Sequence, residues 1–257
     1  MVLPKIESAM RAWVLLVSSF VLMANGPVAL RSGAAVDLAG VPFAVQSAEA
    51  SRGVEYDDNN VLRFKVAPGA VWQGDRRAGK ANERAEISSK LRGYFGETMS
   101  AKFSIRLGNN PGLRKGRDWM VLAQIHGPNR NTLPEGRSFA SPVFALELRG
   151  DELVFIARGG SEEDGETGQR IVGSIPARFG SWQSFSVIAE LRDDGRLGIA
   201  TDEGTFFTNG PVGYDAGDAM HYWKFGIYRS PGIKVTQSMD FYLHCLGVSG
   251  PCEGAAQ

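Results

Sequence analysis

Residues 222–228 read Tyr-Trp-Lys-Phe-Gly-Ile-Tyr and alternate between apolar and polar positions. Side chains at i and i+2 share one face of a β-strand, so this stretch predicts a strand with two different faces. One face is apolar and is expected to pack in a core: Trp223, Phe225 and Ile227. The other face carries proton-active groups and a glycine that would let a ligand approach the backbone: Tyr222, Lys224, Gly226 and Tyr228.

Two other stretches show the same two-faced pattern. Residues 122–126 read Leu-Ala-Gln-Ile-His, and alternation puts Gln124 and His126 on one face. Residues 83–87 read Glu-Arg-Ala-Glu-Ile, and Arg84 and Glu86 project together. Each pattern alone fits a sheet with one solvated face. Together they supply Arg, Gln, His, Lys and Tyr side chains, which makes a shared chemical site the stronger interpretation.

The rest of the chain after about residue 50 consists of short segments rich in β-branched and aromatic residues, separated by turns such as Pro68-Gly69. This pattern predicts an all-β fold, an antiparallel sandwich or barrel in one domain, and no helix. Asp193-Asp194-Gly195 reads as a hairpin turn, so its carboxylates are not expected to act as an acid/base pair. The expected strands cover residues 61–66, 99–107, 120–125, 143–148, 153–157, 182–191, 198–201 and 223–228.

The N-terminal segment has the features of a secretory signal. Lys5 and Arg11 precede an apolar run, Ala12–Ala24. The run is shorter than the roughly 20 apolar residues that a membrane span needs. An uncleaved N-terminal anchor is the alternative. We expect a periplasmic or secreted protein with no stable membrane insertion after cleavage, divided into a signal peptide (1–35), a linker (36–50) and a single domain (51–257).

Charge composition argues against nucleic-acid binding, and the cysteine content predicts a disulfide. The chain has 28 Lys and Arg against 28 Asp and Glu, so it lacks the basic charge that nucleic-acid binding usually requires. In an oxidising compartment its only cysteines, Cys245 and Cys252, are expected to form a disulfide; a free catalytic thiol is the alternative. An acidic loop, Asp57–Asn60, could hold calcium, although its spacing matches no known calcium loop.

The three two-faced stretches resemble signature blocks of the jelly-roll polysaccharide lyases, which include alginate lyases, glucuronan lyases and the heparin lyase I group. The blocks are Arg84-Ala85-Glu86-Ile87, Gln124-Ile125-His126 and the stretch 222–228, in the same chain order as in that family. Many alginate lyases have a second arginine where this chain has Ser88. The block without that arginine and residues 225–229 of this chain are closer to those of glucuronan lyases and heparin lyase I. The resemblance implies a β-jelly roll with a concave substrate groove.

The resemblance also implies a reaction and roles. Such lyases remove the C5 proton of a uronic acid and expel O4 by β-elimination, with no metal or cofactor. Arg84 and Gln124 would neutralise the carboxylate, and His126, with its near-neutral unperturbed pKa, would be the base. Tyr228 would be the acid, and also the base in a syn elimination. Lys224 could lower the pKa of Tyr228 or bind the substrate carboxylate. Glu86 and Tyr222 are further candidates for substrate binding.

Two other function classes remain as alternatives. A non-catalytic carbohydrate-binding sandwich would not need a base facing an acid. A glycoside hydrolase would need two carboxylates flanking the bond, and no strand supplies such a pair. The remaining histidines carry no matching motif: alternation turns His221 toward the core, and His244 lies beside Cys245. We therefore expect a monomeric lyase acting on an anionic polysaccharide.

Overall fold

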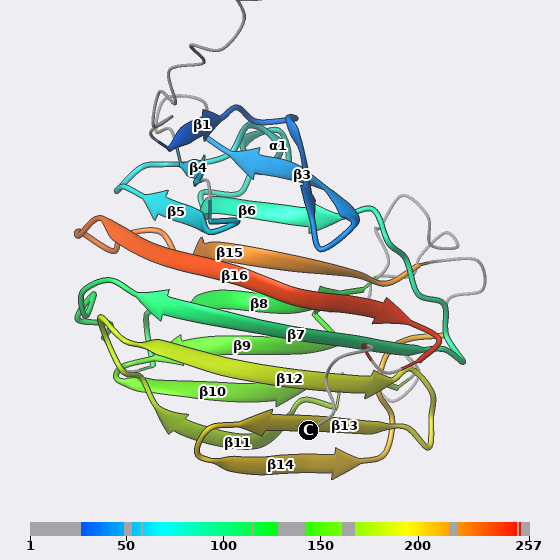
Figure 1. Cartoon of the computed structure of the whole chain (residues 1–257). Helices are drawn as coiled ribbons and strands as arrows, with labels where there is room; N and C mark the ends of the chain where they lie inside the picture. The colour runs from blue at the N-terminus through cyan, green and yellow to red at the C-terminus, as the bar shows by residue number, and fades with distance from the viewer. Residues whose placement is uncertain are drawn as a thin grey trace, which may run out of the picture.

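The computed structural model describes residues 27–48, 53–57, 59–114, 116–127, 142–160, 168–215, 220–250 and 252. Two antiparallel sheets face each other and form a β-sandwich (Figure 1). The first sheet contains, in spatial order, β1 (Val28–Leu30), β4 (Val54–Tyr56), β5 (Leu62–Val66), β16 (Gln237–Val248), β7 (Thr98–Leu107), β12 (Trp182–Glu190), β13 (Arg196–Thr201) and β14 (Gly204–Asn209).

The second sheet carries all three stretches singled out in the sequence. In spatial order it contains β11 (Arg170–Pro176), β10 (Glu152–Ala157), β9 (Phe144–Arg149), β8 (Met120–His126), β15 (Tyr222–Arg229), β6 (Glu83–Ser89), β3 (Val41–Ser47) and β2 (Ala35–Leu38). One short helix, α1 (Gln73–Arg77), precedes β6. The expected all-β jelly-roll sandwich is confirmed. The prediction of no helix is wrong, because α1 forms a helix of five residues.

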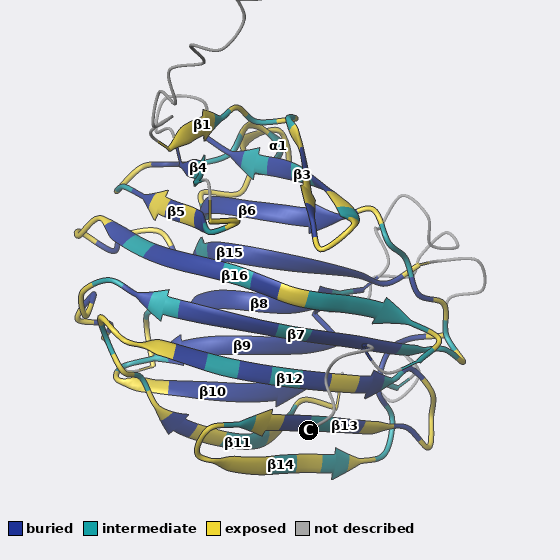
Figure 2. Cartoon of the chain, in the orientation of Figure 1, coloured by how far each residue is buried: buried dark blue, intermediate teal, exposed yellow. Residues whose placement is uncertain are grey.

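Alternation explains how each sheet buries one face. In β15 the apolar side packs into the core, where Phe225 lies 5.2 Å from Phe103 of β7 and 4.7 Å from Phe241 of β16, measured between ring centroids. These rings join the two sheets at the centre of the sandwich, where the strands are buried (Figure 2). Because the apolar face is fixed inward, the polar face of β15 must point to the opposite side of the second sheet.

The expected linker at residues 36–50 is wrong. β2 and β3 form the edge of the second sheet, and Phe43 and Val45 are buried in the core. The domain also begins before residue 36, because β1 pairs with β4. The sequence missed these strands because they are short and are recognisable as strands only through their pairing with each other and with β6. Most of the predicted signal peptide lies outside the described residues, and a chain cut at Ala35 would lack β1.

Further predictions concern a hairpin turn, the two cysteines, the acidic loop and a membrane span. Asp193-Asp194-Gly195 lies in the turn that joins β12 to β13, as expected. Cys245 and Cys252 form the expected disulfide. In the acidic loop Asp57 accepts hydrogen bonds from the backbone N–H groups of Asn59 and Val61, and Asp58 lies outside the described residues. Within the described part of the chain, no helix is long and apolar enough to cross a membrane.

Candidate active site

The three signature stretches lie on adjacent strands, with β15 between β8 and β6. On one side Tyr222 pairs with His126 and Lys224 with Gln124. On the other side Tyr228 pairs with Arg84, which is the residue two positions before Glu86. Residues about 40 and 100 positions apart in sequence are therefore neighbours on one face of the second sheet, which was the central expectation from the sequence.

A bulge in β15 sets the position of Tyr228. The pairing with β8 shifts between Phe225 and Tyr228, and Gly226 within this interval has φ of +133°. A Cβ on Gly226 would lie 2.3 Å from the Ala85 carbonyl oxygen of β6. Glycine is therefore required by the close approach of β6 and by the backbone conformation. The expectation that Gly226 makes room for a ligand is wrong, because β6 fills that space.

A groove of about 900 Å³ lies over this face of the sheet. Its lining includes the predicted acid, base and carboxylate-binding residues: Arg84, Gln124, His126, Lys224 and Tyr228. Two residues expected to bind substrate are absent from the lining. Glu86 is only 1% exposed, and Tyr222 stacks on the His126 ring at 5.0 Å between centroids. Both contact groove residues, and neither is part of the groove lining.

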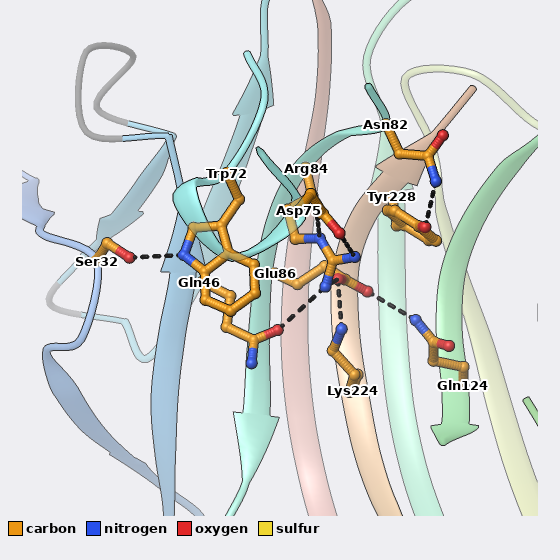
Figure 3. Close-up of polar contacts among 10 residues, drawn as sticks. All are labelled: Ser32, Gln46, Trp72, Asp75, Asn82, Arg84, Glu86, Gln124, Lys224 and Tyr228. Atoms are coloured by element: carbon orange, nitrogen blue, oxygen red, sulfur yellow. Dashed lines mark hydrogen bonds and ion pairs between the residues drawn. The ribbon is translucent and has the colours of Figure 1, made fainter. Parts of the chain in front are cut away.

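Glu86 joins three of the groove residues (Figure 3). Its Oε1 accepts a hydrogen bond from Gln124 Nε2 at 2.8 Å, and its Oε2 lies 2.7 Å from Lys224 Nζ and 3.2 Å from Arg84 Nη1. Burial opposes the charge of this carboxylate, but the ion pairs with Lys224 and Arg84 outweigh burial and lower the pKa of Glu86. Glu86 therefore stays ionised and fixes the direction of all three donors.

Arg84 is held by partners that the sequence did not reveal (Figure 3). Asp75 of α1 pairs with its guanidinium, at 2.7 Å to Nε and 2.9 Å to Nη2. The guanidinium carbon also lies 5.3 Å from the Trp72 ring centroid and 4.2 Å from that of Tyr228. Two carboxylates and two aromatic rings thus immobilise Arg84, which leaves few of its N–H groups for a ligand.

Lys224 and His126 are both pushed toward their neutral forms. Burial first, opposed by the nearby Glu86, lowers the pKa of Lys224 to about 8. Burial first, and then the positive charge of Lys224, lowers the pKa of His126 to about 4. The Nδ1 of His126 lies 2.7 Å from the Gly127 carbonyl oxygen, which can only accept, so Nδ1 carries the proton and Nε2 keeps a free lone pair. His126 is thus a neutral imidazole at neutral pH.

Tyr228 lines the same groove and is held by Asn82, Arg84 and Trp119. Its hydroxyl oxygen accepts a hydrogen bond from Asn82 Nδ2 at 2.5 Å, and the Trp119 ring lies edge-on at 5.0 Å between centroids. Burial raises the pKa of Tyr228, and Arg84 opposes that shift. A lowered pKa of Tyr228, as the sequence suggested through Lys224, is therefore not found, because burial outweighs the nearby positive charge. A phenol that stays protonated is suited to donate a proton.

A sequence profile of the polysaccharide lyase family matches residues 34–242. The chain belongs to this family. Among solved structures, a family 7 alginate lyase in complex with its substrate aligns with a TM-score of 0.54 and 14% identity, covering 81% of this chain and 92% of that chain. An endo-β-1,4-glucuronan lyase from the fungus Trichoderma reesei aligns with a TM-score of 0.54 and 13% identity, covering 89% and 92%. Curated protein sequences gave no match.

The part of the lyase groove over β9 and β10 has a different lining. An apolar cluster of Val121, Ala145, Val154 and Ile156 packs there, against Trp119 and Tyr228. Beside it, Glu147 binds Arg149 at 2.8 Å and lies 3.8 Å from Arg158. The sequence did not single out these residues, because an alternating strand looks the same whether its polar face meets solvent or a ligand.

The sequence analysis also missed Asp75 and Asn82. Only Asn82 could have been found, from the alternation pattern of the strand that follows it. Asn82 precedes Arg84 by two positions, so extending the alternation of β6 backwards would have put it on the groove face. Asp75 sits in a five-residue helix that no periodicity could indicate. The remaining histidines lie away from the groove: His221 is fully buried, as expected, and His244 is exposed and contacts Ser104.

Proposed function

We propose that this lyase cleaves a uronic-acid polysaccharide by β-elimination. The observation that carries the proposal is that a neutral imidazole, His126, and a protonated phenol, Tyr228, line one groove together with three cationic or amide donors. A base and an acid are both needed because the C5 proton must leave while the O4 oxygen is expelled.

Neutralising the uronate carboxylate is the first requirement, because the C5 proton is barely acidic while that carboxylate is charged. Lys224 uses one of its three N–H groups on Glu86, and Gln124 uses one of two. The remaining N–H groups are free to bind the carboxylate and stabilise the enolate that forms from it. Preorganised donors of this kind contribute about 3–4 kcal/mol each.

Protons and electrons then move in the elimination as follows. His126 Nε2 takes the C5 proton, the electrons of that bond form the C4=C5 double bond, and the C4–O4 bond breaks. The O4 oxygen takes the proton of the Tyr228 hydroxyl. His126 is left protonated and Tyr228 is left as a phenolate beside Arg84, whose guanidinium carbon lies 4.2 Å from the ring centroid. Exchange with water restores both groups.

The same proposal places the enzyme outside the cytoplasm as a monomer. The basic residues and apolar run at the N-terminus support export, and the Cys245–Cys252 disulfide fits an oxidising compartment. Expression in a bacterial host, followed by cell fractionation and N-terminal mass analysis, tests export. A protein recovered with an intact N-terminus from the cytoplasm would contradict it.

Ultraviolet absorbance tests the chemistry. The purified protein is mixed with glucuronan, alginate, heparin-like chains and bacterial uronate polymers in turn. An elimination creates a double bond conjugated to the carboxylate, so absorbance rises with the reducing ends. New reducing ends without absorbance would indicate a hydrolase. Binding without either product would indicate the non-catalytic carbohydrate-binding alternative.

A further inference from the structure

Asn82 touches the proposed acid without lining the groove. It lies just before β6, and its Nδ2 donates a hydrogen bond to the Tyr228 hydroxyl oxygen at 2.5 Å (Figure 3). Asn82 is not among the residues that line the groove, whereas Tyr228 is. Asn82 therefore contacts the phenol oxygen of a groove residue without being part of the groove lining itself.

This hydrogen bond decides where the phenol proton can point. An N–H group from Asn82 occupies one lone pair of the hydroxyl oxygen, and two donors cannot face each other, so the O–H bond must turn away from Asn82. The ring itself cannot rotate freely, because the Arg84 guanidinium stacks on it and Trp119 packs edge-on. The direction left for the proton is away from Asn82, on a residue that lines the groove.

We propose that Asn82 is a positioning residue that holds Tyr228 as the proton donor of the elimination. Before the reaction its N–H directs the phenol proton toward the leaving O4 oxygen. After the proton has moved to O4, the same N–H donates to the phenolate oxygen and stabilises its negative charge. This inference rests on the proposed role of Tyr228 as the acid.

The electrostatic surroundings of Tyr228 agree with this role. Burial raises the pKa of Tyr228, while Arg84 and the hydrogen bond from Asn82 act to lower it. Asp75 of α1 and Glu86 of β6 act in the opposite direction, and Lys224 Nζ lies 5.9 Å from the ring centroid. With the charges so opposed, Asn82 is the partner that acts directly on the hydroxyl oxygen.

The first test is Asn82→Ala in the full chain. A hydrogen bond to a charged group is lost, so kcat should fall by about 10- to 100-fold, while KM should stay near the wild-type value because Asn82 does not line the groove. Asn82→Ser keeps a hydroxyl donor and should recover part of the rate. Asn209→Ala, an exposed asparagine in the first sheet, is the matched control. An Asn82→Ala enzyme with wild-type kcat would overturn the proposal.

The second test combines Asn82→Ala with Tyr228→Phe. If Asn82 acts through the phenol oxygen, its substitution should cost nothing further once that oxygen is removed. An additional 10- to 100-fold loss in the double variant would mean that Asn82 acts elsewhere, which contradicts the proposal.

The third test needs no turnover. Ionisation of Tyr228 is followed by ultraviolet phenolate absorbance, as the difference between the wild type and Tyr228→Phe, and again between Asn82→Ala and the double variant. The midpoint should move to higher pH in Asn82→Ala, because a donor to the phenolate is lost. An unchanged midpoint would overturn the role of Asn82 even in an active enzyme. A wild type that forms no unsaturated product would instead overturn the proposed function and leave this shift unaffected.

Discussion

The two halves of the groove use the same sheet for different tasks. Over β6 and β15, charged side chains are buried and bound to one another, as in the pair between Glu86 and Lys224. Over β9 and β10 the floor is apolar, and the pair between Glu147 and Arg149 sits at a rim where the Arg149 side chain is 38% exposed. Under the proposed function, the charged half would move protons and the apolar half would support a sugar ring.

The largest effect should come from removing the acid in the charged half. Tyr228→Phe keeps the ring packing against Trp119 and Arg84 but has no proton to donate. Loss of general acid catalysis should lower kcat by about 10²- to 10⁴-fold with little change in KM. Absorbance of the unsaturated product gives the rate, and circular dichroism checks the fold. Wild-type turnover in this variant would remove Tyr228 from the mechanism.

Substitutions in the two halves of the groove should also differ in how much they lower the free energy of unfolding. Glu86→Gln leaves buried Arg84 and Lys224 with a single counter-ion, Asp75, and should lower the free energy of unfolding by about 3–5 kcal/mol. Glu147→Gln, the matched change in the other half, weakens a pair with the 38% exposed Arg149 and a longer contact with Arg158, and should cost about 1 kcal/mol. Urea unfolding measures both values. Equal losses would contradict the distinction between the halves.

Acid should destabilise the fold through His126. Its pKa is about 4 in the folded protein and about 6.5 in the unfolded chain, so between these pH values the unfolded chain binds more protons. Stability is full above pH 6.5 and should fall by up to about 3 kcal/mol as pH drops to 4.

Thermal unfolding at pH 7 and pH 4.5 checks this expectation. His126→Gln should lose part of the difference in Tm between the two pH values. His244→Gln, which changes an exposed ring, should keep most of it. The expectation fails if both variants respond to acid as the wild type does.

The smallest effect is expected in the apolar half. Val154 lines the groove and belongs to the apolar cluster, and Val154→Thr replaces one methyl group of contact surface with a hydroxyl. This corresponds to about 1 kcal/mol of apolar contact, or roughly a fivefold rise in KM, with kcat unchanged. Initial rates on the polymer identified in the absorbance panel measure it. A fall in kcat alone would assign Val154 to the chemical step.

Some residues of this site could be predicted from the sequence, and others could not. Gln124, His126 and Tyr228 were found because each follows a period of two in a strongly apolar strand, which is a local property of the chain. The linker at residues 36–50 was misassigned because β2 and β3 are recognisable as strands only through their pairing with each other and with β6. The sequence could not show that Glu86 and Tyr222 lie outside the groove lining, because sharing a face does not reveal which side chain covers another.

The sequence by itself determined which residues share a strand face, because side-chain direction depends only on local backbone geometry. It therefore determined the all-β class and the polar face of β15. Only the tertiary structure decided which strands became neighbours, where the bulge at Gly226 turns Tyr228, and that Asp75 and Asn82 meet Arg84 and Tyr228. Those contacts join residues as far as 146 positions apart, so they exist only after both sheets have packed around one core.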